Sequence, residues 1–177
     1  MPAREATVTE PLREEHRDLL PHIDRFHAVA DSIGEAGSED VRRGVDAVYE
    51  FLAHHLIPHA EAEERALYPV VARVMGAPEA TATMSRDHVE VMRLTERLAS
   101  LRAEIEGAID PAHARALRRV LYGLYALVKV HFAKEEEVYL PLLDERLRPD
   151  EAARMFADME AAAAEARQAT GARGGAL

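Results

Sequence analysis

The sequence predicts an all-α protein, an up-down-up-down four-helix bundle followed by a C-terminal helix. Ala, Leu, Glu and Arg dominate the 177 residues, and these residue types favour helices. Apolar residues recur at helical spacing along four long segments, and no alternating strand pattern competes with them. Short connections separate the segments, and such connections place consecutive helices side by side and antiparallel in a bundle.

The first predicted helix covers 9–33 and follows an arm at 1–8 that we expect to be flexible. Thr9 is a candidate N-cap, and Pro11 suits the first turn because no hydrogen bond is required from its nitrogen there. Gly34 ends the helix. The apolar stripe of this helix consists of Leu12, Leu19, Leu20, Ile23, Phe26, Val29, Ala30 and Ile33.

The second predicted helix covers 38–75. Ser38 is the expected N-cap, and Gly76 ends the helix. Pro58 and Pro69 fall inside this span, and each removes a backbone donor, so we expect the helix to bend or break at both positions. Its apolar stripe begins with Val41, Val45, Val48, Leu52 and Leu56.

The third and fourth predicted helices cover 79–106 and 110–147. Asp110 followed by Pro111 is a helix-start signal, since Asp caps the first turn and Pro suits the first helical position. The inward residues are Met84, Val91, Leu94, Leu98, Leu101 and Ile105 in the third helix and Leu117, Val120, Leu124, Leu127 and Val128 in the fourth.

A shorter, Ala-rich fifth helix is predicted at 150–168, after Pro149 interrupts the preceding helix. We therefore divide the chain into a bundle domain at 9–147, an accessory C-terminal helix at 148–169 and a flexible tail at 170–177.

Composition excludes several classes of function. The formal net charge of −10 argues against a nucleic-acid partner, which needs a basic face, and favours cationic partners such as metal ions. The absence of Cys excludes a disulfide scaffold, a thiolate metal site and Cys catalysis. No signal-like or membrane-spanning apolar stretch is visible, so we expect a cytoplasmic protein with no membrane partner. The oligomeric state is not determined by the sequence.

An eleven-residue phrase occurs twice. HAEAEERALYP starts at His59 and HFAKEEEVYLP starts at His131, and both read H-x3-E-E-x4-P. The same offset of 72 positions aligns His16 with His88 without a gap, and it also aligns the apolar stripes of the two halves with each other. The repeat predicts a duplicated helical hairpin with pseudo-twofold symmetry, whose paired residues meet at the axis.

The polar residues of the repeat lie on the apolar faces. His59 and Glu63 are four residues apart and share the helix face of Leu52 and Leu56, which points inward. A lone core histidine or a surface His–Glu pair is common and needs no metal. Burying four imidazoles and two carboxylates without compensation, however, costs several kcal/mol per charge. The entire stability of a domain is only roughly 5–15 kcal/mol. A dinuclear metal centre satisfies these groups, and its candidate ligands are His16, His59, Glu63, His88, His131 and Glu135.

The donor types favour iron. Two His and one carboxylate in each half, with open positions, are typical of non-haem iron, whereas structural zinc prefers four closed ligands. The Glu-x-x-His motif of ferritin-like di-iron bundles does not occur in the sequence. We expect two non-haem iron ions, with manganese as the less favoured metal.

The pattern resembles the hemerythrin-like (HHE cation-binding) family over roughly 9–147: one His on the first helix, H-x3-E on the second, one His on the third and H-x3-E on the fourth. The resemblance implies a four-helix bundle around an oxo- or hydroxo-bridged di-iron site. It implies that His16, His59, His88 and His131 are terminal ligands and that Glu63 and Glu135 are bridging carboxylates.

Two positions depart from the oxygen-carrying members of the family. Those carriers place a second His one turn after the third-helix His, where this chain has Met92, and their fourth-helix carboxylate follows its His by five positions, where this chain has Glu136. Glu135 is favoured as the second bridge because it is the repeat mate of Glu63. His55 or a tyrosine is an alternative extra ligand, although His55 is better explained as a residue at the rim.

The resemblance and the open metal positions together suggest reaction with a small molecule: peroxide, O2 or NO. Our first hypothesis is a catalase-like di-iron protein that disproportionates peroxide, although enzymatic turnover is not established by the sequence. The alternative is a protein that binds or senses O2, NO or iron without turnover. A purely structural bundle would retain the residues without binding metal.

Overall fold

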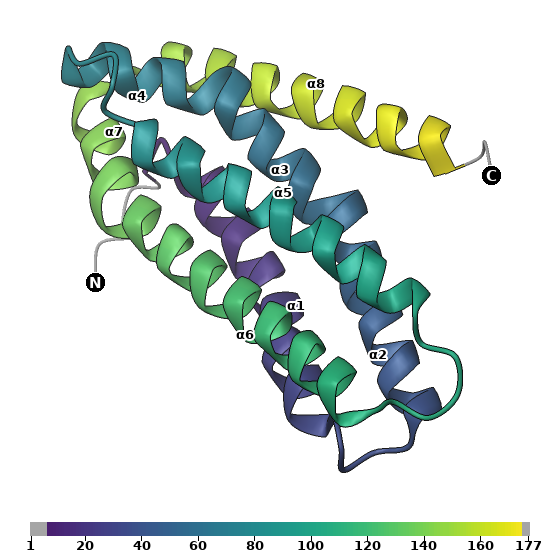
Figure 1. Cartoon of the computed structure of the whole chain (residues 1–177). Helices are drawn as coiled ribbons and strands as arrows, with labels where there is room; N and C mark the ends of the chain where they lie inside the picture. The colour runs from purple at the N-terminus through teal and green to yellow at the C-terminus, as the bar shows by residue number, and fades with distance from the viewer. Residues whose placement is uncertain (1–6, 175–177) are drawn as a thin grey trace, which may run out of the picture.

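A computed structural model describes residues 7–174 of the chain, with side chains through 169 (Figure 1). The first and third bundle helices are α1 (Glu10–Ser32) and α5 (Ala82–Ala103). The second bundle helix is a continuous run of α2 (Ser38–Phe51), η1 (Leu52–Leu56), α3 (Ile57–Ala62), η2 (Glu63–Leu67) and α4 (Tyr68–Met75). The fourth runs through α6 (Pro111–Lys134), η3 (Glu135–Tyr139) and α7 (Leu140–Arg146).

These four helices confirm the predicted up-down-up-down bundle. α6 packs against α1 and α5, and α2 packs against α1 and α5 on the opposite side. The fifth helix, α8 (Pro149–Gly174), lies outside the bundle along α3 and η2 (Figure 1). No strand occurs in residues 7–174. Within the same residues, no helix combines the length and apolar character needed to cross a membrane.

The helix boundaries differ from the predicted ones in several places, and α5 covers Ala82–Ala103 where 79–106 was predicted. Gly37, rather than Ser38, is the N-cap of α2, and its neighbour Ser38 already belongs to the helix. Thr9 precedes α1 but directs its hydroxyl to Asp144 Oδ1 at 2.8 Å instead of capping. Asp110 caps α6 as predicted, accepting two backbone N–H bonds. The helix α8 extends past the expected boundary at residue 169. The rest of the predicted arm and tail, 1–6 and 175–177, lies outside the described residues.

At Pro58, Pro69 and Pro141 the helix opens into a π turn instead of breaking. The residue before Pro58 bonds its N–H to the carbonyl of Leu52, five positions earlier. The same five-residue bond precedes Pro69 and Pro141. A wider turn keeps the helix continuous where a proline has no N–H to donate, so the expected break is replaced by a π-helical segment. Such segments are frequent at functional sites.

The apolar core has two parts with a polar layer between them. One part fills the end of the bundle near the α1–α2 connection, and the other fills the opposite end and extends under α8. In α1, His16 lies between Leu12 of the second part and Leu19 of the first. In α5, His88 lies between Met84 and Val91 in the same way. The bundle therefore holds its polar residues at one level, sealed above and below by apolar side chains.

Candidate metal centre

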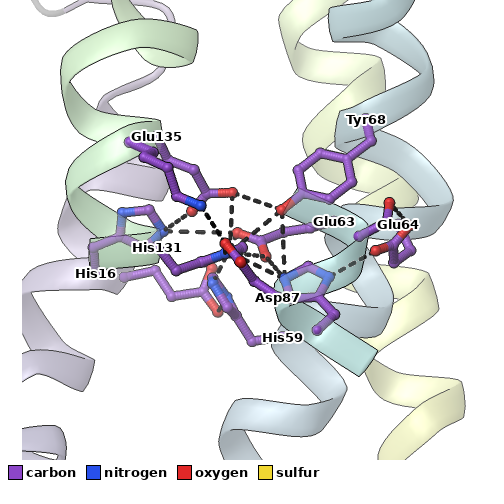
Figure 2. A network of polar contacts seen from close by, with 12 residues as sticks. His16, His59, Glu63, Glu64, Tyr68, Asp87, His131 and Glu135 are labelled. Carbon is purple, nitrogen blue, oxygen red and sulfur yellow. Dashed lines mark hydrogen bonds and ion pairs between the residues drawn. The ribbon is translucent and has the colours of Figure 1, made fainter. Parts of the chain in front are cut away.

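Side chains from all four bundle helices meet in this layer (Figure 2). The four imidazoles and two carboxylates predicted from the repeat are between 0% and 6% exposed. They are His16 of α1, His59 of α3, Glu63 of η2, His88 of α5, His131 of α6 and Glu135 of η3. The structure thus brings all six predicted residues into one cluster.

His16 and His59 form one half of the cluster. The Nε2 atom of His59 lies 3.0 Å from Glu63 Oε1. The Nε2 atom of His16 lies 3.4 Å from Glu135 Oε2 and 3.8 Å from Glu63 Oε1. One donor atom each from His16, His59 and Glu63 lie within 4.8 Å of one another, and Glu135 Oε2 borders this group at His16.

His88 and His131 form the other half. Their Nε2 atoms lie 3.0 Å apart. Glu63 Oε2 is 3.2 Å from the Nε2 of His88, and Glu135 Oε1 is 3.5 Å from the Nε2 of His131. Each carboxylate thus offers one oxygen to each histidine pair, which is the arrangement of a carboxylate that bridges two cations. The two His/Glu sets form a buried cluster consistent with a di-metal site.

Tyr68 adds a hydroxyl to the second half only. Its Oη donates to Glu135 Oε1 at 3.0 Å and lies 3.4 Å from His88 Nε2 and 3.3 Å from His131 Nε2 (Figure 2). The repeat mate of Tyr68 is Leu140, which has no polar atom to offer to the first half. The second half therefore has one more candidate oxygen donor than the first.

Several of these atoms have no hydrogen-bond partner among the described residues. They are His16 Nε2, His59 Nε2, both oxygens of Glu63 and Glu135 Oε2. His59 Nε2 approaches Glu63 Oε1 to 3.0 Å, but the direction of approach does not make a hydrogen bond. Leaving buried groups of this kind unsatisfied costs about 1–3 kcal/mol each, and more for charged groups. Cations placed between them would use all of these free donor atoms, so the residues fit a two-metal site.

Each histidine is oriented by a carboxylate on its other ring nitrogen. The Nδ1 of His16 bonds to Glu136 at 2.8 Å, and the Nδ1 of His88 bonds to Glu64 at 2.7 Å. An Nδ1–H that donates to a carboxylate leaves the Nε2 lone pair directed at the cluster and raises its basicity. Glu136 and Glu64 are repeat mates, and each reaches across from one hairpin to the other.

The other two histidines are held within their own hairpins. His59 Nδ1 bonds to Glu15 at 2.9 Å, and His131 Nδ1 bonds to Asp87 at 3.1 Å. Asp87 also accepts a bond from Lys134. Glu15 and Asp87 are again 72 positions apart. All four imidazoles are thus held with Nε2 pointing inward.

The two buried carboxylates have opposite pKa shifts. Burial acts to raise the pKa of Glu63, but the surrounding imidazoles, His59 above all, outweigh burial and hold this pKa well below its usual range. Burial and the neighbouring charge of Glu63 raise the pKa of Glu135 to about 8. Burial would lower the pKa of His59, yet the Glu63 charge and the bond to Glu15 raise it well above the usual value. The protein alone therefore keeps protons in the cluster, whereas two cations would stabilise both carboxylates as anions.

The structure separates the alternatives that the sequence left open. Glu136 bonds to His16 Nδ1 and to Arg13, whereas Glu135 has an oxygen near each histidine pair. His55 is exposed and stacks on Phe51. Four other histidines lie away from the cluster. His27 and His54 pair with carboxylates of their own helices, His22 stacks on Phe51, and His113 bonds to the backbone carbonyl of Leu101.

The sequence analysis missed two carboxylates beside the cluster, Glu15 and Asp87, and it left a tyrosine open as an extra ligand without identifying Tyr68. Glu15 and Asp87 could have been found, because each directly precedes a cluster histidine at matching positions of the repeat. Tyr68 could not be found by helical spacing, since it lies five positions after Glu63. In an α-helix that separation is about 140° around the axis. The π turn of η2 brings Tyr68 back toward the face of Glu63.

Comparison with known proteins agrees with this geometry. The model of the family described as Hemerythrin HHE cation binding domain matches residues 7–143, which is most of the chain. That span contains the first three bundle helices and the fourth as far as the first half of α7. It also contains every residue of the cluster. No match was found among curated proteins or among solved structures.

Proposed function

Because the chain belongs to the hemerythrin HHE cation-binding domain family, we propose that the cluster holds two non-haem iron ions and reacts with peroxide. The donor set is the reason for choosing iron: imidazole and carboxylate donors with positions left open are typical of non-haem iron, and manganese is the second choice. The observation that carries the proposal is the set of free donor atoms on His16, His59, Glu63 and Glu135.

The spacing of the donors supports two six-coordinate positions. With metal–ligand bonds of about 2.1 Å, neighbouring corners of an octahedron lie about 3 Å apart. The contacts described above between neighbouring donor atoms range from 3.0 to 3.8 Å. We assign His16 and His59 to one cation, His88 and His131 to the other, and Glu63 and Glu135 to both.

Tyr68 is the seventh proposed protein ligand. Its Oη lies 3.0 to 3.4 Å from His88 Nε2, His131 Nε2 and Glu135 Oε1. These distances fall in the same range as the contacts between the other donor atoms. It would ligate only the cation of His88 and His131, because Leu140 replaces it in the other half. The two cations would then be unequal, with more open positions on the one held by His16 and His59.

The chemistry suits a two-electron substrate. Two bound iron ions would supply two electrons, which together with two protons reduce one hydrogen peroxide to two waters. A second hydrogen peroxide would return two electrons and two protons as it is oxidised to O2. The protein contributes orientation through Glu15, Glu64, Asp87 and Glu136, each of which bonds to the Nδ1 atom of one imidazole. It also excludes bulk water, since the cluster lies between two apolar core regions.

Peroxide turnover tests the proposal. Iron-loaded protein should release O2 from peroxide well above the rate of free iron at equal concentration, and His59→Ala should lose that activity. His54→Ala is the matched control, because His54 is half-buried on the same bundle helix and pairs with Glu50. Equal O2 release from wild type and His59→Ala would overturn the proposal. A reversible spectral change with O2 or NO, without turnover, would favour the alternative of a binding or sensing protein.

A further inference from the structure

A pocket of about 190 Å³ opens on the surface between α3 and α5. Its walls are mainly apolar and include Ile57, Val89 and Met92. Val89 is 46% exposed and Met92 is 40% exposed, so these two side chains stand at the mouth. Met92 is also the position at which the oxygen carriers place a further histidine, and here that position borders open space.

A second, smaller cavity adjoins this pocket. It measures about 10 Å³ and is lined by four of the six cluster residues, His59, Glu63, His88 and His131. Leu56, Val128 and Phe132 complete its apolar wall. A space of this size holds roughly one water-sized molecule. It is therefore the place where a small ligand would meet the proposed cations.

The two spaces share three lining residues, Ala60, His88 and Val91. His88 is held by Glu64 and by the cluster, and Val91 is buried in the core. Ala60 is the smallest of the three, and its side chain is only a methyl group. The width of the connection between the pocket and the cluster is therefore set mainly by the absence of side-chain bulk at position 60.

The charges around the pocket select against anions. Glu61 and Glu64 line it, and no Lys or Arg does. Glu64 bonds to His88 Nδ1 and Ser85 Oγ, which keeps its carboxylate beside the passage. Like charges repel an approaching anion and slow its association, whereas a neutral molecule is unaffected.

We propose that this pocket is the access route of the cluster, that it admits small uncharged molecules in preference to anions, and that Ala60 is its gate. The inference rests on the proposed metal site but not on peroxide turnover. It restricts the substrate class to neutral molecules of two to four atoms, such as hydrogen peroxide, O2 or NO, and disfavours superoxide.

The gate is tested by stopped-flow absorbance of NO binding to the anaerobic Fe(II)-loaded protein. Ala60→Phe should slow NO association about tenfold or more, because the ring fills the passage and binding then waits for a conformational change. The larger side chain projects into the existing pocket, so the fold has room for it. Ala47→Leu is the control, since Ala47 lines a separate pocket between α1 and α2. Met92→Trp plugs the mouth without touching the cluster and should also slow NO.

Iron content, measured for each variant, separates blocked access from a lost site. NO association within twofold of wild type in both Ala60→Phe and Met92→Trp, at equal iron content, would overturn the access route. If both variants slow NO but wild type does not turn over peroxide, the route stands and the proposed peroxide reaction fails. A wild-type protein that binds neither iron nor NO overturns both.

The charge filter has its own readout. Azide, an anion at neutral pH, should bind the Fe(III)-loaded protein faster in Glu61→Gln than in wild type, and faster as salt concentration rises. NO association should not change in either case. An azide rate that is insensitive to both salt and Glu61→Gln contradicts the proposed selection against anions.

Discussion

Tyr68 and Leu140 occupy the same position of the 72-residue repeat, yet only Tyr68 reaches the cluster. Its Oη lies 3.0 Å from Glu135 Oε1, while Leu140 is fully buried in the apolar core. The duplicated hairpin thus carries a symmetric set of histidines and an asymmetric oxygen. The two proposed metal positions would be inequivalent as a consequence.

Tyr68→Phe tests this asymmetry. If the phenolate oxygen ligates iron, the Fe(III)-loaded wild type has a visible phenolate-to-iron absorption band, and Tyr68→Phe loses it while keeping about two irons per chain. Tyr139→Phe is the matched control, because Tyr139 is buried nearby but bonds to the backbone carbonyl of Ala80. A visible spectrum unchanged in Tyr68→Phe would contradict ligation by this residue.

Glu135 and Glu136 should respond differently to removal of their charge. Glu135→Gln takes an oxygen anion from both cations, so iron should fall from about two per chain to about one or fewer. Glu136→Gln only weakens the support of His16, which should reduce metal affinity about 10- to 100-fold while two irons still bind at saturation. Metal analysis and competition with a chelator distinguish these results. The reverse order of effects would make Glu136 the bridge.

The carboxylates behind the histidines should contribute measurably to metal affinity. Asp87→Asn leaves His131 Nδ1 with a neutral partner and breaks the ion pair to Lys134, so affinity for Fe(II) should fall about 10-fold or more. Asp24→Asn serves as control because it removes a similar ion pair, with Lys129, on the surface. Equal Fe(II) affinities for the two variants would argue that Asp87 only stabilises the fold.

Metal-free and iron-loaded protein should show opposite pH dependence. Burial lowers the pKa of His59, His88 and His131, but the Glu63 carboxylate outweighs it, and all three values are raised above 6.5. Burial and the Glu63 charge raise the pKa of Glu135 from 4.5 to about 8. A raised pKa in the folded state gives stability that is complete below the unfolded value and is lost as pH rises through the folded value. The metal-free protein should therefore lose stability as pH rises from about 6 through 8.

Iron binding has the opposite requirement, since its ligands must be deprotonated. Stabilisation by bound metal grows with affinity, so the gain in Tm on Fe(II) addition should increase steadily across the same pH range. Anaerobic thermal unfolding with and without Fe(II) measures this difference. A gain in Tm that stays constant or shrinks as pH rises would contradict protonation of the cluster in the metal-free state.

The fold and six residues of the site were accessible from the sequence because both follow from fixed helical spacing. His59 and Glu63 continue the stripe of Leu52 and Leu56, so the register that builds the core also directs these groups inward. The π turns were not accessible, because a proline within a helical pattern predicts a break. The tyrosine left open as an extra ligand could not be identified as Tyr68 for the same reason, since only the wider turn of η2 brings it to the cluster. Glu15 and Asp87 form contacts between neighbouring helices that the spacing within one helix does not reveal.

Anomalous diffraction at the iron edge from crystals of the iron-loaded protein tests the central claim most directly. The account predicts two peaks within the bundle, one between the Nε2 atoms of His16 and His59 and one between those of His88 and His131, with Glu63 and Glu135 spanning both. A single peak, or peaks outside these four imidazoles, would contradict it.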